Sequence, residues 1–316
     1  MLRYRREISI IGALAIILVV LAVAAPSFYR GNQLRNIAVE NASVLVAAVG
    51  MTLVIVARHI DISIGSMLSI CGVAAGLLAK AGLPMPVVVL ATIITGGLLG
   101  AVNGTFVAYV GLPSIVVTLA TMKIFSEALR WWREGAFVNN LPPTFQWFGC
   151  GQTVGQWIVV GVALAVFLIF AWALRFLKAG RAVYATGSDP DAAWLVGVRP
   201  RRVTFWIFVL MGALTGLAAV LDAVRLPQVD PGAGGGLELQ VIAAVVVGGV
   251  AISGGRGTLI GVLFGVALLA TIHPALVFLG AESYWSKALE GAIILIAVAS
   301  DAFSFRRRGH AVAVAG

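Results

Sequence analysis

Charged residues are scarce in this sequence. Asp, Glu, Lys and Arg make up 11% of its 316 residues, whereas 60% are hydrophobic and the mean hydropathy is +1.03. A soluble domain carries about 25% charged residues, so this composition excludes an ordinary soluble protein. Long apolar runs such as 8–25 and 159–174 do not alternate, which excludes the strands of about 10 residues typical of a membrane β-barrel. We therefore expect an all-α integral membrane protein.

Side chains that could perform chemistry are also few. The chain has 3 His and 2 Cys, and Cys71 and Cys150 lie in different segments without metal-ligand spacing. The phosphate-binding pattern G-x-x-x-x-G-K-[ST] is absent as well. We expect no metal, no cofactor and no catalytic residue in this chain.

The sequence does contain a series of long apolar segments. A membrane-spanning helix needs about 20 predominantly apolar residues. On this basis hydropathy predicts about ten spans in a polytopic bundle, within a single transmembrane domain over 1–316 that has short tails at 1–7 and 304–316. The predicted spans are 8–25, 37–57, 62–79, 85–108, 114–131, 156–176, 203–222, 237–253, 257–279 and 285–302.

The basic residues predict the orientation of these spans. Most of the 22 Lys and Arg residues fall on one side of the predicted bundle, at the two termini and in the loop 178–202. Because cytoplasmic loops are enriched in Lys and Arg, both termini and this loop are predicted to be cytoplasmic. Membrane topology thus explains the net charge of +9, and we expect no nucleic-acid partner.

Glycine recurs at every fourth position in two segments. The two series are Gly96, Gly100 and Gly104, and Gly257, Gly261 and Gly265. Positions four apart share a helix face, so each series predicts close helix packing, with a sliding surface in a conformational cycle as the alternative. The chain also has a weak internal sequence similarity, which we call the echo: the similar segments 60–66 and 250–258 each precede one of the two glycine series. Two weakly similar halves of this kind are typical of transporters.

Polar side chains interrupt the apolar segments at a few positions. These are Asp61, Ser63, Ser66, Asn103, Thr118 and Thr121. Polar groups inside a membrane are costly and usually functional, so they are candidates for lining the pathway of a neutral polyol at a broken helix. The alternative is structural: Ser63 and Ser66 would cap a helix, Asp61 would pair with Arg58, and the others would join helices.

The cytoplasmic loop 178–202 is the most patterned of the loops. Asp189 or Ser188 can cap a short helix that has Pro190 at its first position, and Gly197 can end it. The residues expected to contact a partner are Asp189, Pro190, Asp191, Ala192, Ala193, Trp194 and Gly197. Such a short helix suits the groove of another protein. The alternative is a hairpin packed on its own bundle.

Four motifs resemble one family. Residues 60–66, Asn103-Gly104 with 113–119, 180–198 and 248–258 follow, in this order, the pattern of the permease subunits of bacterial ATP-binding-cassette (ABC) importers for monosaccharides. This family includes ribose, xylose, rhamnose and autoinducer-2 permeases. One departure is Arg58-His59, where many members have two glycines. It resembles the rhamnose and autoinducer-2 branch, and it leaves open whether the turn keeps the backbone of its relatives.

The resemblance implies a function and a set of partners. It implies a permease that moves a monosaccharide across the bacterial inner membrane by alternating access. The leading substrate would be a rhamnose-like deoxyhexose. Residues 189–197 would be the coupling helix that binds a cytoplasmic ABC ATPase. A periplasmic sugar-binding protein and a second permease subunit, identical or different, would complete the importer within the lipid. The alternatives are an importer of autoinducer-2 or another pentose or hexose, and an ion-coupled secondary sugar carrier that uses Asp61 or Glu127.

Overall fold

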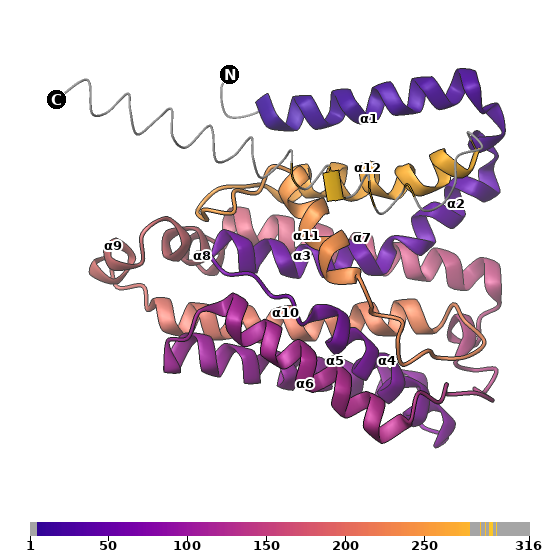
Figure 1. Ribbon diagram of the computed structural model, residues 1–316, viewed down its shortest axis with the longest axis horizontal. Helices are drawn as coiled ribbons and strands as arrows, with labels where there is room; N and C mark the ends of the chain where they lie inside the picture. Colours follow the sequence, from indigo (N-terminus) through magenta and orange to yellow (C-terminus); the bar gives the residue numbers. More distant parts are fainter. Residues whose placement is uncertain (1–4, 279–284, 286–287, 289–290, 293–294, 296–316) are drawn as a thin grey trace.

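The structure is a computed structural model that describes residues 5–278 together with residues 285, 288, 291, 292 and 295. Over this part of the chain the regular secondary structure is helical, and one isolated β-bridge joins Val138 to Val229. The predicted all-α class is confirmed (Figure 1). The long helices run roughly along one direction, as expected for a bundle that crosses a membrane.

The helices fall into long and short ones. The long helices are α1 (Arg5–Ala24), α5 (Met85–Thr105), α6 (Ser114–Arg133), α7 (Gln152–Phe176), α10 (Pro200–Ala223) and α12 (Leu259–Phe278). The shorter ones are α2 (Gly31–Glu40), α3 (Ala42–Val56), α4 (Ile64–Lys80), α8 (Lys178–Ser188), α9 (Pro190–Leu195) and α11 (Leu237–Val247). Single helical turns are η2 (Pro26–Tyr29), η3 (Phe106–Val110, a π-helical extension of α5) and η4 (Gln146–Gly149).

Nine of the predicted spans correspond to a helix among the described residues. Four helical stretches, Met85–Val110, α7, α10 and α12, are long and apolar enough to cross a membrane, and α2 with α3 would form a fifth that is bent by 40°. Helices α4 and α11 are apolar but shorter, and α6 carries Lys123 and Glu127. The predicted span 285–302 lies largely outside the described residues, so the total of ten stays a prediction.

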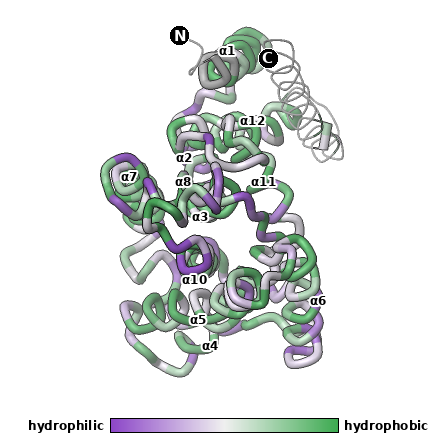
Figure 2. The backbone as a smooth tube through the Cα atoms, turned by 90° about the vertical axis from the view of Figure 1, so that its left-hand side faces the viewer, coloured by the Kyte–Doolittle hydropathy of each residue, from purple (hydrophilic) through white to green (hydrophobic). Residues whose placement is uncertain are grey.

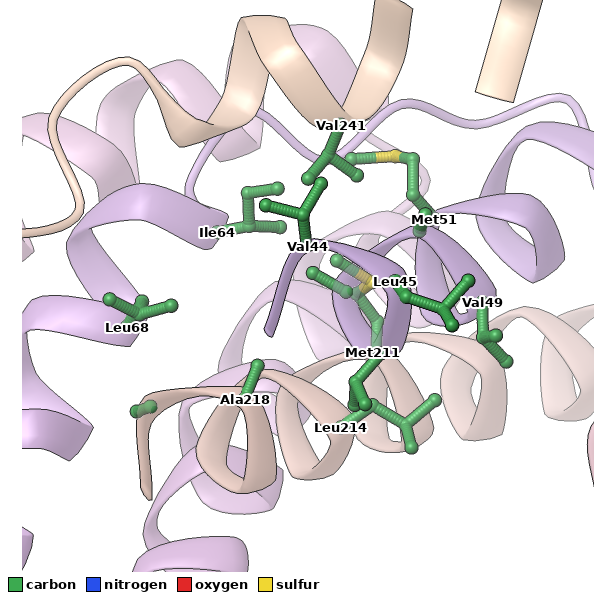
Figure 3. Packing of buried hydrophobic residues seen from close by; sticks show 14 of the residues in the cluster. Val44, Leu45, Val49, Met51, Ile64, Leu68, Met211, Leu214, Ala218 and Val241 are labelled. Atoms are coloured by element: carbon green, nitrogen blue, oxygen red, sulfur yellow. The ribbon is translucent and has the colours of Figure 1, made fainter. Parts of the chain in front are cut away.

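Helix α3 lies at the centre of the bundle. Every residue from Ala42 to Val56 is buried, which its sequence allows because it is apolar all round. It packs against α10, α7 and α11. Figure 3 shows the side chains that meet there, from α3 (Val44, Leu45, Val49, Met51), α10 (Met211, Leu214, Ala218), α4 (Ile64, Leu68) and α11 (Val241).

The outer helices present apolar side chains to the outside. Leu90 and Leu98 of α5 and Leu168 of α7 have relative exposures of 60%, 64% and 63%. Figure 2 shows hydrophobic residues on peripheral helices such as α4 and α5 as well as in the interior. Such a surface suits contact with lipid rather than with water.

The first glycine series lies where α5 crosses α10. A Cβ atom on Gly96 would overlap the carbonyl oxygen of Gly212, and one on Gly100 would overlap the carbonyl oxygen of Phe208. The reverse also holds, since a Cβ on Gly212 would overlap the carbonyl oxygen of Gly96. The two backbones are therefore in direct contact, and Gly104 continues the series against Phe205.

The second glycine series needs a correction. Gly261 and Gly265 lie on α12 against the backbone of Gly248 and Ala244, but Gly257 precedes the helix, which begins at Leu259. Gly257 has a φ of 141°, a backbone conformation that favours glycine. The prediction that all three share one helix face is therefore wrong for Gly257, because the chain is not yet helical there.

Candidate functional site

Two breaks between helices meet at one end of the bundle. The first is the segment 57–63 between α3 and α4, and the second is the segment 248–258 between α11 and α12. They overlap the two echoing sequence segments, 60–66 and 250–258. The amide of Gly255 donates to the carbonyl oxygen of Val56 at 2.8 Å, and Arg58 Nε donates to the carbonyl oxygen of Ser253 at 2.8 Å. The two breaks are thus joined directly by hydrogen bonds.

Arg58 shows how the first break keeps its shape. Its φ is 68°, in the left-handed region that glycine adopts without strain. The backbone conformation of a glycine is thus present although the side chain is arginine, and the side chain bonds to Ser253 rather than to Asp61. The structural alternative of an Arg58–Asp61 ion pair is therefore wrong.

Asp61, Ser63 and Asn103 form a fully buried polar network at the start of α4. Asp61 Oδ1 accepts hydrogen bonds from the backbone N–H of Ser63 at 2.9 Å and from its hydroxyl at 2.6 Å. Asn103 Nδ2 donates to Ser63 Oγ at 2.8 Å, which brings α5 to the break. Ser66 Oγ donates to the carbonyl oxygen of Ser63 at 2.8 Å. Neither serine hydroxyl caps α4, so the predicted serine cap is wrong and Asp61 fixes the turn instead.

Helix α6 is hydrogen-bonded to the same break, at Ile60. Thr118 Oγ1 lies 3.3 Å from the carbonyl oxygen of Ile60 and 2.8 Å from that of Ser114. The Ile60 N–H donates to Ser114 Oγ at 3.2 Å. Ser114 was not among the predicted site residues, although its place after Pro113 at a helix start was a usable signal. Thr121 Oγ1 donates within its own helix, to the carbonyl oxygen of Thr118 at 3.3 Å.

Two oxygen atoms of the network have no partner among the described residues. Asp61 Oδ2 and Asn103 Oδ1 are buried and accept no hydrogen bond there. Within the described part of the chain an ion pair joins Arg225 to Asp222, and none involves Asp61. An unpaired carboxylate in a membrane interior is costly. The side chain of Asp61 therefore stabilises the turn through Oδ1 and has no counter-ion in the part of the chain that the structure describes.

We expect the hydrogen bonds of Asp61, and not its charge, to stabilise the protein. Asp61→Asn keeps a carbonyl acceptor for Ser63 and should cost less than about 1 kcal/mol of unfolding free energy, whereas Asp61→Leu leaves buried donors unpaired and should cost about 2–4 kcal/mol. Thermal unfolding in detergent measures both variants. Asp230→Leu, at a half-buried turn outside the network, is the control. A larger loss in Asp61→Asn than in Asp61→Leu would contradict this assignment.

His59 links the first break to α10. Its Nε2 lies 3.3 Å from Thr204 Oγ1, and its ring centroid lies 5.8 Å from that of Phe208. Burial lowers the pKa of His59 from 6.5 to about 4, so the imidazole is neutral near pH 7. The break therefore has contacts to α5, α6 and α10 together.

Helices α8 and α9 occupy the loop 178–202 and project from the same end of the bundle (Figure 1). Asp189 Oδ1 accepts from the amides of Asp191 at 3.0 Å and Ala192 at 3.1 Å, with Pro190 at the first helical position. Gly197 follows α9 with a φ of 85°. Ala193 is buried, whereas Trp194, Leu195 and Val196 are 67%, 78% and 76% exposed. An apolar tip of this kind is suited to contact another protein.

The C-terminal end of α8 rests on both breaks. A Cβ on Gly187 would overlap the carbonyl oxygen of Val56 and lie 2.9 Å from the amide nitrogen of Gly255. Tyr184 Oη donates to the carbonyl oxygen of Gly257 at 2.8 Å. We call Val56, Arg58, Gly187, Ser253 and Gly255 the junction. One residue, Asp189, separates α8 from α9, so α9 is connected to the junction through α8.

Comparison with known proteins identifies the family. Residues 33–298 match the family described as "Branched-chain amino acid transport system / permease component". The chain belongs to this permease family. Its relatives include the ribose import permease protein RbsC of Escherichia coli K12, 33% identical over 293 residues, which are 92% of this chain and 91% of the relative. No solved structure matches the chain.

Two further relatives are autoinducer-2 permeases. The autoinducer 2 import system permease protein LsrC of Escherichia coli K12 / DH10B is 32% identical over 292 residues, which cover 91% of this chain and 85% of the relative. The LsrC protein of Salmonella paratyphi B is 33% identical over 273 residues, covering 86% and 79%. The resemblance to sugar-importer permeases is thus confirmed. This permease is a transport subunit and not an enzyme, whereas nothing among these relatives confirms the leaning towards rhamnose.

Proposed function

We propose that this chain is the membrane permease subunit of an ABC importer that moves a neutral monosaccharide into the cell by alternating access. The observation that carries the proposal is a continuous series of contacts. It runs from the exposed tip of α9, through Gly187 of α8, to both helix breaks. A cytoplasmic ABC ATPase would bind the tip. A periplasmic sugar-binding protein would deliver the sugar on the other side of a bacterial inner membrane, with both termini of the permease in the cytoplasm.

The mechanism follows from the contacts at the junction. Closure of the ATPases on ATP would displace α9, and α8 would carry this displacement to the segments 57–63 and 248–258. The first of these holds the Asp61–Ser63–Asn103 network, so its movement would shift the start of α4 relative to α5. A second permease subunit, a copy of this chain or a relative, would move in the same way. Alternating access then needs no chemistry in this chain.

The choice of substrate rests on the polar groups. The hydroxyls of Ser63 and Thr118 bond within the protein. Among the described residues, the uncharged Asn103 Oδ1 keeps an unused acceptor, which suits a sugar hydroxyl. The named relatives import ribose and autoinducer-2, and we retain a rhamnose-like deoxyhexose beside them because Arg58-His59 resembles that branch. An ion-coupled carrier is the second candidate, favoured by the unpaired Oδ2 of Asp61.

Reconstitution into proteoliposomes tests the proposal. The chain, its ATPase and its binding protein should together take up labelled ribose, rhamnose or xylose only when ATP is enclosed with the ATPase. Dissipating the ion gradients with ionophores should leave uptake unchanged, and so should Asp61→Asn. Uptake by this chain alone that ionophores abolish would establish the ion-coupled carrier instead.

A further inference from the structure

A hollow is lined by residues of elements that include α2, and α2 lies at the end of the bundle opposite to α9 (Figure 1). The volume of the hollow is about 190 Å³, smaller than the about 300–1,000 Å³ usual for sites that bind drug-sized ligands, so it suits only a small ligand. It is formed by α2, η4, α7 and the residues that follow α10, over the outer end of the central helix α3. The lining residues are Asn36, Val39, Glu40, Trp147, Gln156, Arg225 and Leu226. None of them belongs to the polar network around Asp61.

Gln156 is the residue that points to a ligand. It is 5% exposed, and its Oε1 is buried without a hydrogen-bond partner among residues 5–278 and the few described beyond them. A buried amide oxygen without a donor is destabilising, since the group loses its hydration and receives nothing in return. The missing partner is a hydrogen-bond donor, and the hydroxyl of a ligand in the hollow would supply one.

The charges around the hollow favour a neutral ligand. The positive charge of Arg225 is already paired, because Nη1 lies 3.1 Å from Asp222 Oδ1 and also donates to the carbonyl oxygen of Glu40 at 3.4 Å. The carboxylate of Glu40 adds a negative charge that disfavours anions. Carboxylate and amide groups remain to bind hydroxyls, which are donors and acceptors at once.

Trp147 supplies the apolar part of the site. Its backbone is held in place, since its N–H donates to the carbonyl oxygen of Val224 at 2.9 Å. Trp147, Val39 and Leu226 place apolar surface beside the polar groups. A sugar needs this combination, because its hydroxyls lie around a ring whose C–H faces are apolar. We propose that this hollow is a monosaccharide-binding subsite on the outer side of the permease; the proposal rests on the proposed function.

Binding to the full-length chain in lipid nanodiscs tests the subsite. Saturation-transfer NMR would be recorded with D-ribose, L-rhamnose and L-leucine as probes. At least one sugar should bind saturably and L-leucine should not. Gln156→Leu and Trp147→Leu should each weaken sugar binding about tenfold or more. The matched controls Gln152→Leu and Trp157→Leu, at exposed neighbours on α7 that do not line the hollow, should bind as the parent does.

The outcomes separate this inference from the function itself. Thermal unfolding of each variant would first show that it is folded, and Gln156→Glu would keep an acceptor oxygen where Gln156→Leu removes it. Equal sugar binding by Gln156→Leu and the parent, or saturable binding of L-leucine alone, would overturn the subsite. If the complete importer takes up sugar on ATP while the hollow binds none, only the subsite is wrong. If no sugar is taken up by the complete importer, the proposed function is wrong.

Discussion

Replacing Gly187 with valine is expected to reduce ATP-driven sugar uptake by about 100-fold or more while the ATPase subunit still binds. The reason is geometric: a Cβ at this position would overlap the carbonyl oxygen of Val56. That oxygen accepts the 2.8 Å hydrogen bond from Gly255 that joins the two breaks. Overpacking costs about 1–3 kcal/mol, and a broken buried hydrogen bond costs about 1–3 kcal/mol more. Helix α8 should therefore separate from the junction.

The measurement needs two readouts, because a misfolded variant would lose both. Uptake into proteoliposomes reports transport, and co-purification with the ATPase reports the integrity of α9, whose tip lies outside the junction. Gly187→Ala should give a smaller loss of uptake in the same direction. Gly161→Val is the matched control, since a Cβ on Gly161 of α7 meets nothing within 4 Å. Parental uptake by Gly187→Val would show that contact between α8 and the breaks is not needed for coupling.

Local sequence patterns were sufficient to predict most of the helices. The apolar runs located the central elements, since the length of a run and its lack of alternation are local properties. The cap at Asp189 with Pro190 and the termination at Gly197 were equally local. Where the prediction was wrong, a local pattern competed with tertiary structure. The predicted span 237–253 ends as a helix at Val247, because the glycines that follow turn the chain into the second break.

The contacts that make the candidate site could not be predicted from the sequence. Arg58 and Ser253 are separated by 195 positions, and no periodicity relates them. The echo between residues 60–66 and 250–258 suggested two similar halves, but not that the halves touch. The role of Gly187 was likewise hidden, since a glycine near a helix end is more often a terminator than a contact. Gln156 gave no signal, because its unpaired oxygen is a property of the packed fold.

Substitutions at the tip of α9 are expected to have the second large effect, on binding of the ATPase. Replacing Trp194 and Leu195 together with alanine should weaken binding of the ATPase by about 30-fold or more, because exposed aromatic and aliphatic anchors commonly contribute about 2 kcal/mol or more at an interface. The stability of the permease should change by less than about 0.5 kcal/mol, since both side chains are largely exposed, at 67% and 78%. Uptake should fall with the affinity and recover at high ATPase concentration.

The two substitutions at α9 and at Gly187 differ in what rescues them. Excess ATPase should restore uptake by the α9 variant, because binding is the step that was weakened, but it should not restore Gly187→Val, whose ATPase is already bound. Trp206→Ala is the matched control for the loss of an exposed tryptophan, since Trp206 is 60% exposed on α10 and lies outside α9. Its ATPase affinity, measured by surface plasmon resonance on nanodiscs, should equal that of the parent. If the α9 variant also binds the ATPase with parental affinity, the partner of this tip is not the ATPase, and the importer must be coupled through another surface.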